Sequence, residues 1–306
     1  LCEEGDGAPL GIERAGDDLL FLYTGGTTGM PKGVMWAHDD HWHAGTAGAT
    51  VATELVPPAS LAEHAENVRR AGGGARLMPC CPLMHGTGLF TAIGTLAQGG
   101  SIVTLEGASF DAGECLAAVD RWKVNGLAIV GDAFAKPLLR ALDAADGKYD
   151  VSSLVSMVSS GVMWSMEVKQ GLLRHNPAMV LTDSFGASEA VGFGRSDTTV
   201  EGTVQTARFV LGEHCKVFTE DFREVRPGDP EAGFVARAGA IPRGYYKDPE
   251  KTAKTFPVID GVRYSMPGDW VRVEADGSLV LLGRGSVCIN TAGEKVYPEE
   301  VEEVLK

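Results

Sequence analysis

The 306-residue sequence lacks any apolar run of the length that a membrane-spanning helix needs, about 20 residues. It is also short of basic residues, with 27 Lys and Arg against 41 Asp and Glu and a formal net charge of −14. This deficit argues against nucleic acid as a partner, because phosphate backbones are held mainly by Lys and Arg. A small polyanion would have to be held by local donors and metal ions, since the overall field repels it.

Cysteine is scarce as well. The six cysteines form neither a CxxC pair nor the Cys/His spacing of a zinc site. Cys80 and Cys81 are adjacent, and a disulfide between chain neighbours is strained. We therefore predict reduced thiols in a cytoplasmic protein, because disulfides are rare in that compartment.

Glycine is abundant, with 40 residues, and it is most densely mixed with hydroxyls just after the apolar run Leu19–Tyr23, which predicts a buried strand. Glycines let a ligand approach the backbone closely, and successive N–H groups in such a turn form an anion site. We predict that this stretch binds polyphosphate and is more than a surface turn. It differs from the P-loop, because Pro31 precedes the lysine and Gly33 follows it. The candidate residues are Thr24, Gly25, Gly26, Thr27, Thr28, Gly29 and Lys32.

The stretch Tyr23–Val34 resembles the signature loop of the adenylate-forming enzymes, which include acyl-CoA synthetases, luciferases and adenylation domains. Gly26 stands where most members have Ser. The Gly-Gly version that continues into Trp36 is most similar to the fatty-acid-CoA ligase branch. The resemblance implies that Thr27 and Lys32 are catalytic and that the other candidates of the loop hold the nucleotide.

A second motif, Asp183–Glu189, follows a predicted strand and resembles the family's aromatic-Gly-x-Thr-Glu motif. The resemblance implies that Phe185 stacks on adenine and that Ser188 donates to the α-phosphate. Glu189 is the expected Mg²⁺ ligand, because Mg²⁺ prefers hard oxygen ligands and is shared with nucleotide phosphates. Ser188 and Glu189 are therefore expected to be catalytic. The other nucleotide-binding candidates of the motif are Asp183, Ser184 and Gly186.

Two later motifs resemble the residues with which the family binds ribose. Asp269, in Tyr264–Trp270, stands at the acidic position of a Thr-Gly-Asp motif, and its two oxygens can accept both vicinal ribose hydroxyls. Arg284 resembles the arginine that also reaches the ribose. Ser286 stands where relatives usually have Asp or Lys at a hinge between domains, which leaves hinge behaviour open.

Two further residues are expected near the substrate. A lone His beside glycines is usually structural, but His85 belongs to a His-Gly-x-Gly element that resembles the family's acyl-pocket wall. The segment Ser159–Val162 resembles one that lines the adenine and acyl sites in relatives, so Gly161 is expected there.

Alternating strand and helix patterns between residues 101 and 181 predict a largely parallel sheet with helices on both faces. Beyond Val204, short strands and the hairpin signal Asp276-Gly277 predict antiparallel pairing. The predicted fold is α/β, an acyl-CoA synthetase-like large-domain core followed by a small antiparallel, β-barrel-like subdomain. The expected regions are an α/β nucleotide- and acyl-binding part at 1–204, a β-rich subdomain at 205–284, and a hinge with the beginning of a truncated C-terminal domain at 285–306.

The resemblance implies a reaction that uses ATP, Mg²⁺ and coenzyme A. A lipophilic carboxylate attacks the α-phosphate of MgATP, giving acyl-adenylate and pyrophosphate, and the CoA thiol then displaces AMP. Two alternatives stay open: transfer to the phosphopantetheine of a carrier protein, and nucleotide binding without catalysis. Contact with a carrier protein or with the surface of a membrane is a further expectation.

The ends of the sequence suggest a piece of a longer protein. It begins at Leu1 without a methionine and closes in Glu299–Lys306, a helix-like pattern with no stop signal. The resemblance implies a further lysine in a later small domain, which this sequence does not reach. We therefore expect the 306-residue chain alone to bind nucleotide poorly and to form adenylate slowly or not at all.

Overall fold

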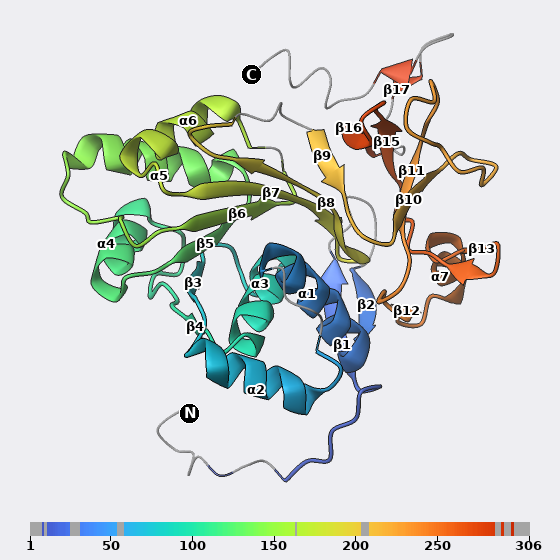
Figure 1. Cartoon of the computed structure of the whole chain (residues 1–306), viewed down its shortest axis with the longest axis horizontal. Coiled ribbons are helices and arrows are strands. Elements are labelled where there is room, and N and C mark those ends of the chain that lie inside the picture. The colour runs from blue at the N-terminus through green and yellow to red at the C-terminus, as the bar shows by residue number, and fades with distance from the viewer. Residues whose placement is uncertain are drawn as a thin grey trace.

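The computed structural model describes residues 8, 11–24, 31–53, 58–162, 164–202, 208–284, 289–290 and 295–296. Side chains are described at these positions except at 46–53, 284, 289–290 and 295–296. One large mixed sheet crosses the molecule, with helices on both sides of its first half (Figure 1).

A small antiparallel sheet of three strands carries the ends of the signature loop. Its order is β1 (Leu19–Thr24), β2 (Lys32–Ala37) and β12 (Gly244–Tyr245). The strand predicted at Leu19–Tyr23 is confirmed, but its predicted burial is wrong, because only Leu22 is buried. β1 lies at the edge of this sheet and pairs with β2 alone. Its side chains alternate between the two faces of the sheet, and those on the outer face are exposed.

The parallel half of the large sheet confirms the predicted α/β core. Its strands pair in the order β4-β3-β5-β6-β7, all parallel. They are β3 (Arg76–Pro79), β4 (Ser101–Ile102), β5 (Gly126–Ile129), β6 (Ser156–Ser160) and β7 (Val180–Ala187). β7 runs past the predicted strand, so most of the motif Asp183–Glu189 lies within it and only its last two residues form the turn.

Helices cover both faces of this half (Figure 1). Residues of α4, α5 and α6 form one buried cluster with the strands, while α3 packs on the other face with α1 nearby. Among the described residues, none of the helices has the length and apolar character needed to cross a membrane. The helices are α1 (His38–Thr53), α2 (Leu61–Ala71), α3 (Gly86–Ala97), α4 (Ala112–Trp122), α5 (Asp132–Ala145) and α6 (Met166–His175).

Local sequence signals set the ends of α2. The Ser60 hydroxyl accepts a hydrogen bond from the N–H of Glu63, which satisfies a donor of the first turn. Gly72 ends the helix at φ +74°, a left-handed conformation that glycine adopts without strain. The serine before the helix and the glycine after it are the usual signals for these two ends.

The second half of the large sheet is antiparallel, as predicted. It continues from β7 in the order β8-β9-β16-β15-β11-β10, and Gly277 forms the predicted hairpin turn at φ +81°. The strands change from parallel to antiparallel pairing between β7 and β8, which is before residue 204. The predicted domain boundary at residue 204 stays a prediction. The strands are β8 (Ala190–Thr198), β9 (Arg208–Leu211), β10 (Cys215–Phe218), β11 (Ala232–Arg237), β15 (Asp269–Val273) and β16 (Ser278–Arg284).

Smaller elements complete the described chain. They are α7 (Pro249–Thr255), the pair β13 (Val258–Ile259) and β14 (Val262–Arg263), and the pair β17 (Ile289–Asn290) and β18 (Lys295–Val296). The rest of the predicted region 285–306, including Ser286, lies outside the described residues.

Four of the cysteines lie in the described chain, and all four are free thiols, in agreement with the predicted reduced state. The sulfur atoms of Cys80 and Cys115 are 3.8 Å apart in the core. This hydrogen bond, together with burial, raises the pKa of the Cys80 thiol well above its ordinary value. Both thiols are buried in the core and pack there as small apolar groups.

Candidate active site

The turn between β7 and β8 is where distant segments of the chain meet. Its two residues are Ser188 and Glu189. The indole N–H of Trp36, in β2, donates to the Ser188 carbonyl at 2.9 Å. The hydroxyl of Ser265 donates to the Glu189 carbonyl at 2.6 Å. Three motifs identified in the sequence are thereby fixed against one another.

The Glu189 side chain is buried, with 9% of the residue exposed. One of its oxygens, Oε1, accepts a hydrogen bond from the Tyr245 hydroxyl at 2.6 Å. Burying a carboxylate is costly unless it accepts hydrogen bonds, so this bond offsets part of that cost. No cluster of three or more acidic, His or Cys groups that could hold a metal occurs among the described residues. A single carboxylate fits Mg²⁺ that is shared with phosphates and water, because Mg²⁺ is commonly held by one or two carboxylates.

The signature loop is anchored at both ends by the hairpin of β1 and β2. Thr24 and Lys32 face each other across the last pair of the register, and Gly33 faces Tyr23. A Cβ atom added to Gly33 would lie 3.3 Å from the Tyr23 ring, so the strands meet closely here. The predicted phosphate-binding residues Gly25, Gly26, Thr27, Thr28 and Gly29 lie outside the described residues.

His85 and Gly161 lie together, close to the turn. Gly161 follows β6 at φ +91°, and a Cβ atom placed on it would lie 3.7 Å from His85 Cε1. His85 caps α3 by accepting a hydrogen bond from the Thr87 N–H at 3.3 Å. A Cβ atom on the next residue, Gly86, would lie 3.6 Å from Ser188 Oγ. The start of α3 therefore lies next to the Ser188–Glu189 turn through Gly86, while the contacts of His85 are with Gly161 and Thr87.

Phe185 has a packing role that the sequence did not indicate. Its ring lies 5.4 Å from that of Phe193 and 5.2 Å from that of Phe209, between ring centroids. Only 7% of Phe185 is exposed, and it belongs to the core of the antiparallel half. Stacking of Phe185 on adenine stays a prediction.

Asp183 is engaged in an ion pair with Lys169 of α6, whose ammonium also lies 5.5 Å from the centre of the Trp164 ring. Lys169 is only 1% exposed. Burial raises the pKa of Asp183, and the attraction of Lys169 opposes that shift. The carboxylate of Asp183 thus ties β7 to α6, and its role toward the nucleotide stays a prediction.

Ser184 and Gly186 are the remaining candidates of the motif. Ser184 lies opposite Ser160 at the end of β6. A Cβ atom on Gly186 would lie 3.1 Å from the Ala190 carbonyl, so glycine permits the tight hairpin between β7 and β8. Both residues shape the approach to the Ser188–Glu189 turn.

The two predicted ribose residues lie on neighbouring strands. Asp269 begins β15 and is directly opposite Arg284 of β16 in the antiparallel register. The register therefore places the two predicted ribose positions next to each other. Their joint contact with the ribose stays a prediction. Asp269 is 8% exposed, and Ser265, which binds the Glu189 carbonyl, precedes it on the same segment.

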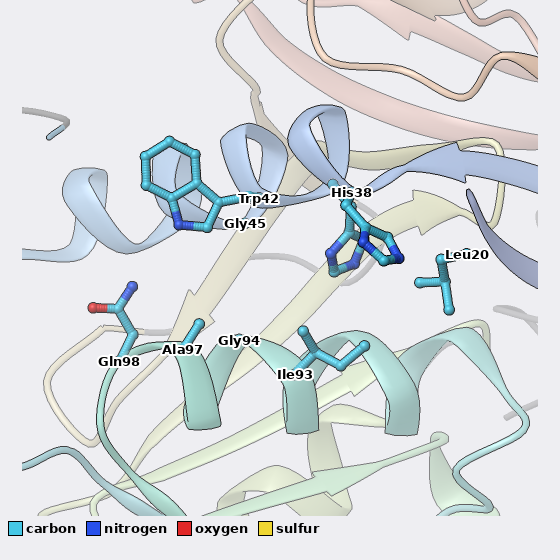
Figure 2. Close-up of a pocket in the computed structure, with 9 residues that line it drawn as sticks. Leu20, His38, Trp42, Gly45, Ile93, Gly94, Ala97 and Gln98 are labelled. Atoms are coloured by element: carbon cyan, nitrogen blue, oxygen red, sulfur yellow. The ribbon is translucent and has the colours of Figure 1, made fainter. Parts of the chain in front are cut away.

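A cavity of about 280 Å³ opens between α1 and α3 (Figure 2). Its lining is mainly apolar, with two imidazoles and an amide. The described residues that line it are Leu20, His38, His41, Trp42, Gly45, Ile93, Gly94, Ala97 and Gln98. His85, at the opposite end of α3, is not among them, so its assignment to the acyl pocket stays a prediction.

Tyr245 was not among the site residues that the sequence predicted. It lies in the segment Gly239–Tyr246, which resembles a further motif of the family, and its bond to Glu189 joins residues 56 positions apart. The signal that could have found it is chemical: a tyrosine on a strand can satisfy a buried carboxylate.

A family model described as "AMP-binding enzyme" matches residues 6–246, which is most of the chain. The chain belongs to the AMP-binding enzyme family. The medium/long-chain-fatty-acid–CoA/3-oxocholest-4-en-26-oate–CoA ligase of Mycobacterium marinum is 42% identical over 99% of the chain and 54% of the relative. The 3-oxocholest-4-en-26-oate–CoA ligase of Rhodococcus rhodochrous is 42% identical over 96% of the chain and 53% of the relative.

Among solved structures, O-succinylbenzoate coenzyme A synthetase from Bacillus subtilis, in complex with AMP, superposes with a TM-score of 0.73. It is 20% identical, and the match covers 95% of this chain and 55% of that one. This chain therefore has the fold of the large domain of the adenylate-forming enzymes, as predicted. It spans about half the length of the curated relatives that it matches.

Proposed function

We propose that the full-length protein is an AMP-forming acyl-CoA synthetase that activates a lipophilic carboxylic acid with MgATP. The observation that carries this proposal is the convergence on the Ser188–Glu189 turn. Trp36, Tyr245 and Ser265 each come from a different family motif and each bonds to that turn. The names of the relatives, both CoA ligases, support the same activity.

The residues of the turn fit the first half-reaction, in which an acid carboxylate displaces pyrophosphate from ATP. Two anions must meet, and negative charge builds up on the phosphate oxygens, so fixed donors and cations aimed at those oxygens lower the barrier. Glu189 would hold Mg²⁺, which would neutralise part of the charge on the phosphate oxygens. Lys32 adds a cation at the start of β2, and in this proposal the Ser188 hydroxyl donates to the α-phosphate.

Asp269 and Arg284 fit the task of holding the ribose, since they face each other across β15 and β16. Gripping the nucleoside keeps the α-phosphate in line with the attacking carboxylate, which is an orientation effect. In the second half-reaction the CoA thiol attacks the acyl carbon and AMP leaves.

The cavity between α1 and α3 suits the apolar part of the acid. One face of α3 carries Gly86, Phe90, Ile93 and Ala97, at helical spacing. Gly86 lies near Ser188 Oγ, and Ile93 and Ala97 line the cavity. This face runs for about 16 Å from the phosphate side toward the cavity. The relatives' named substrates, fatty acids and a sterol-derived acid, are also lipophilic.

A cytosolic location is part of the proposal. It is supported by the free thiols of the described cysteines, since disulfides are rare in that compartment.

The test is acid-dependent release of pyrophosphate from MgATP by the full-length protein, measured over a panel of acids. We expect release with medium- and long-chain or sterol-like acids and little with short polar acids. Thioester formation is then compared with free CoA and with a holo-carrier protein as acceptor. Release of pyrophosphate that no acid stimulates would overturn the proposal. Thioester formed only on the carrier protein would show that this protein, and not CoA, is the acceptor.

A further inference from the structure

The short helix α7 is fixed rigidly to the strand that carries Tyr245. Asp248 caps the helix by accepting a hydrogen bond from the Lys251 N–H at 3.0 Å. Thr252 Oγ1 accepts a hydrogen bond from the Tyr245 N–H at 2.9 Å and donates one to the Asp248 carbonyl at 2.7 Å. The position of Lys251 is therefore set by the backbone of β12.

β12 is in turn fixed to the strand that begins with Lys32. Tyr245 pairs with Val34 in an antiparallel register, and the Tyr246 N–H donates to the Gly33 carbonyl at 2.8 Å. Two segments that are far apart in the sequence, the start of β2 and the first turn of α7, are thereby held side by side.

The side chains of Lys32, Lys251, Tyr245 and Glu189 form one cluster, here called the lysine-pair cluster. The Lys251 ammonium lies 5.4 Å from the centre of the Tyr245 ring, whose hydroxyl donates to Glu189. The neighbouring Lys32 amine lowers the pKa of Lys251, and burial lowers it further. Attraction to Glu189 and Asp248 opposes that shift.

Two neighbouring like charges repel each other, and an anion bound between them relieves that repulsion. A polyphosphate is a better match than a single carboxylate, because its several oxygens can accept from both amines. The carboxylate of Glu189 next to them suits the metal ion that accompanies a nucleotide polyphosphate. The cluster thus combines two cations with one metal-binding group.

We propose that Lys251 is a second phosphate-binding cation, which together with Lys32 holds the β- and γ-phosphates of ATP and the departing pyrophosphate. The proposal rests on the proposed function and adds Lys251 to the residues that perform it. Pyrophosphate carries more negative charge as it leaves than it does within ATP, so a fixed pair of amines favours that step.

The experiment compares Lys251→Gln, Lys251→Arg and Lys254→Gln in the full-length protein. Lys254 is an exposed lysine of the same helix and serves as the matched control. Calorimetry measures binding of Mg²⁺-pyrophosphate, MgATP and AMP without any acid, and thermal unfolding verifies folding. We expect Lys251→Gln to weaken pyrophosphate and MgATP binding about tenfold and to leave AMP binding unchanged, because AMP lacks the outer phosphates. Lys251→Arg should keep most of the affinity, and Lys254→Gln all of it.

The outcomes separate the two proposals. If Lys251→Gln leaves pyrophosphate binding intact, or weakens AMP binding equally, the proposed role of Lys251 is overturned. The proposed function is not affected by that result. A wild-type protein that binds neither MgATP nor pyrophosphate would overturn the proposed function and this inference with it.

Discussion

At the scale of single residues, Glu189 is a buried carboxylate that is held by neighbours distant in the sequence. The Tyr245 hydroxyl occupies one oxygen, and the Ser265 hydroxyl fixes the backbone carbonyl. The carboxylate is therefore oriented by the fold before any ligand arrives, which lowers the cost of organising the site during the reaction.

Removing the Tyr245 hydroxyl should disturb that orientation. We expect Tyr245→Phe to raise the Mg²⁺ concentration needed for half-maximal pyrophosphate release and to lower kcat/KM for MgATP about tenfold, because a hydrogen bond to a charged group is lost. Tyr246→Phe is the matched control, since Tyr246 is exposed and adjacent. A Tyr245→Phe enzyme with an unchanged Mg²⁺ requirement would show that the bond has no positioning role.

The sequence indicated candidate residues but not their contacts. Glu189, Ser188 and Asp269 could be selected because they stand in motifs that resemble those of the family and carry groups suited to metal, phosphate and ribose, respectively. Tyr245 and Lys251 could not, since their relevance depends on partners brought together only by tertiary pairing. Phe185 shows the reverse case, because the sequence indicates an aromatic face while the fold encloses most of the ring.

At the scale of elements, the three-stranded sheet of β1, β2 and β12 sets the geometry of the site. It holds the ends of the signature loop, the Trp36 indole and Tyr245 on adjacent strands. The alternating pattern between residues 101 and 181 predicted helices between the strands, and α6 is one of them. The strand β2 was not predicted, because Lys32–Ala37 follows a proline and reads as a continuation of the loop.

The junction of β12 with α7 depends on Gly244. It has φ +143°, and a Cβ atom added to it would lie 2.8 Å from Thr252 Oγ1, too close without displacement of the helix. We expect Gly244→Ala to lower the free energy of unfolding by about 1–3 kcal/mol and also to weaken pyrophosphate binding, because α7 carries Lys251.

Gly73→Ala is the control for that substitution. Gly73 also has a positive φ, +114°, but a Cβ atom there would meet nothing within 4 Å. Chemical denaturation measures the free energy of unfolding of both variants. The loss in Gly73→Ala reports backbone strain, and any additional loss in Gly244→Ala reports the steric clash. Equal losses of stability would show that the clash with Thr252 contributes nothing.

At the scale of the whole molecule, one hydrogen-bonded sheet joins the parallel and antiparallel halves (Figure 1). Its first half follows from the alternating pattern of the sequence. The continuity of the sheet through β8 and β9 could not be predicted from the sequence. The sequence of an antiparallel strand does not show which strand it will pair with. The candidate site lies where this sheet changes direction, and the small sheet is fixed against that turn through Trp36 and Tyr245.

Acid-dependent pyrophosphate release by the full-length protein, with Glu189→Gln compared with the wild type, tests most directly whether the Ser188–Glu189 turn is the site of adenylation. The exposed Glu201→Gln variant is the matched control. We predict a loss of about 100-fold or more for Glu189→Gln, with an unchanged unfolding temperature and no effect of Glu201→Gln. A Glu189→Gln enzyme that releases pyrophosphate at the wild-type rate would contradict this assignment.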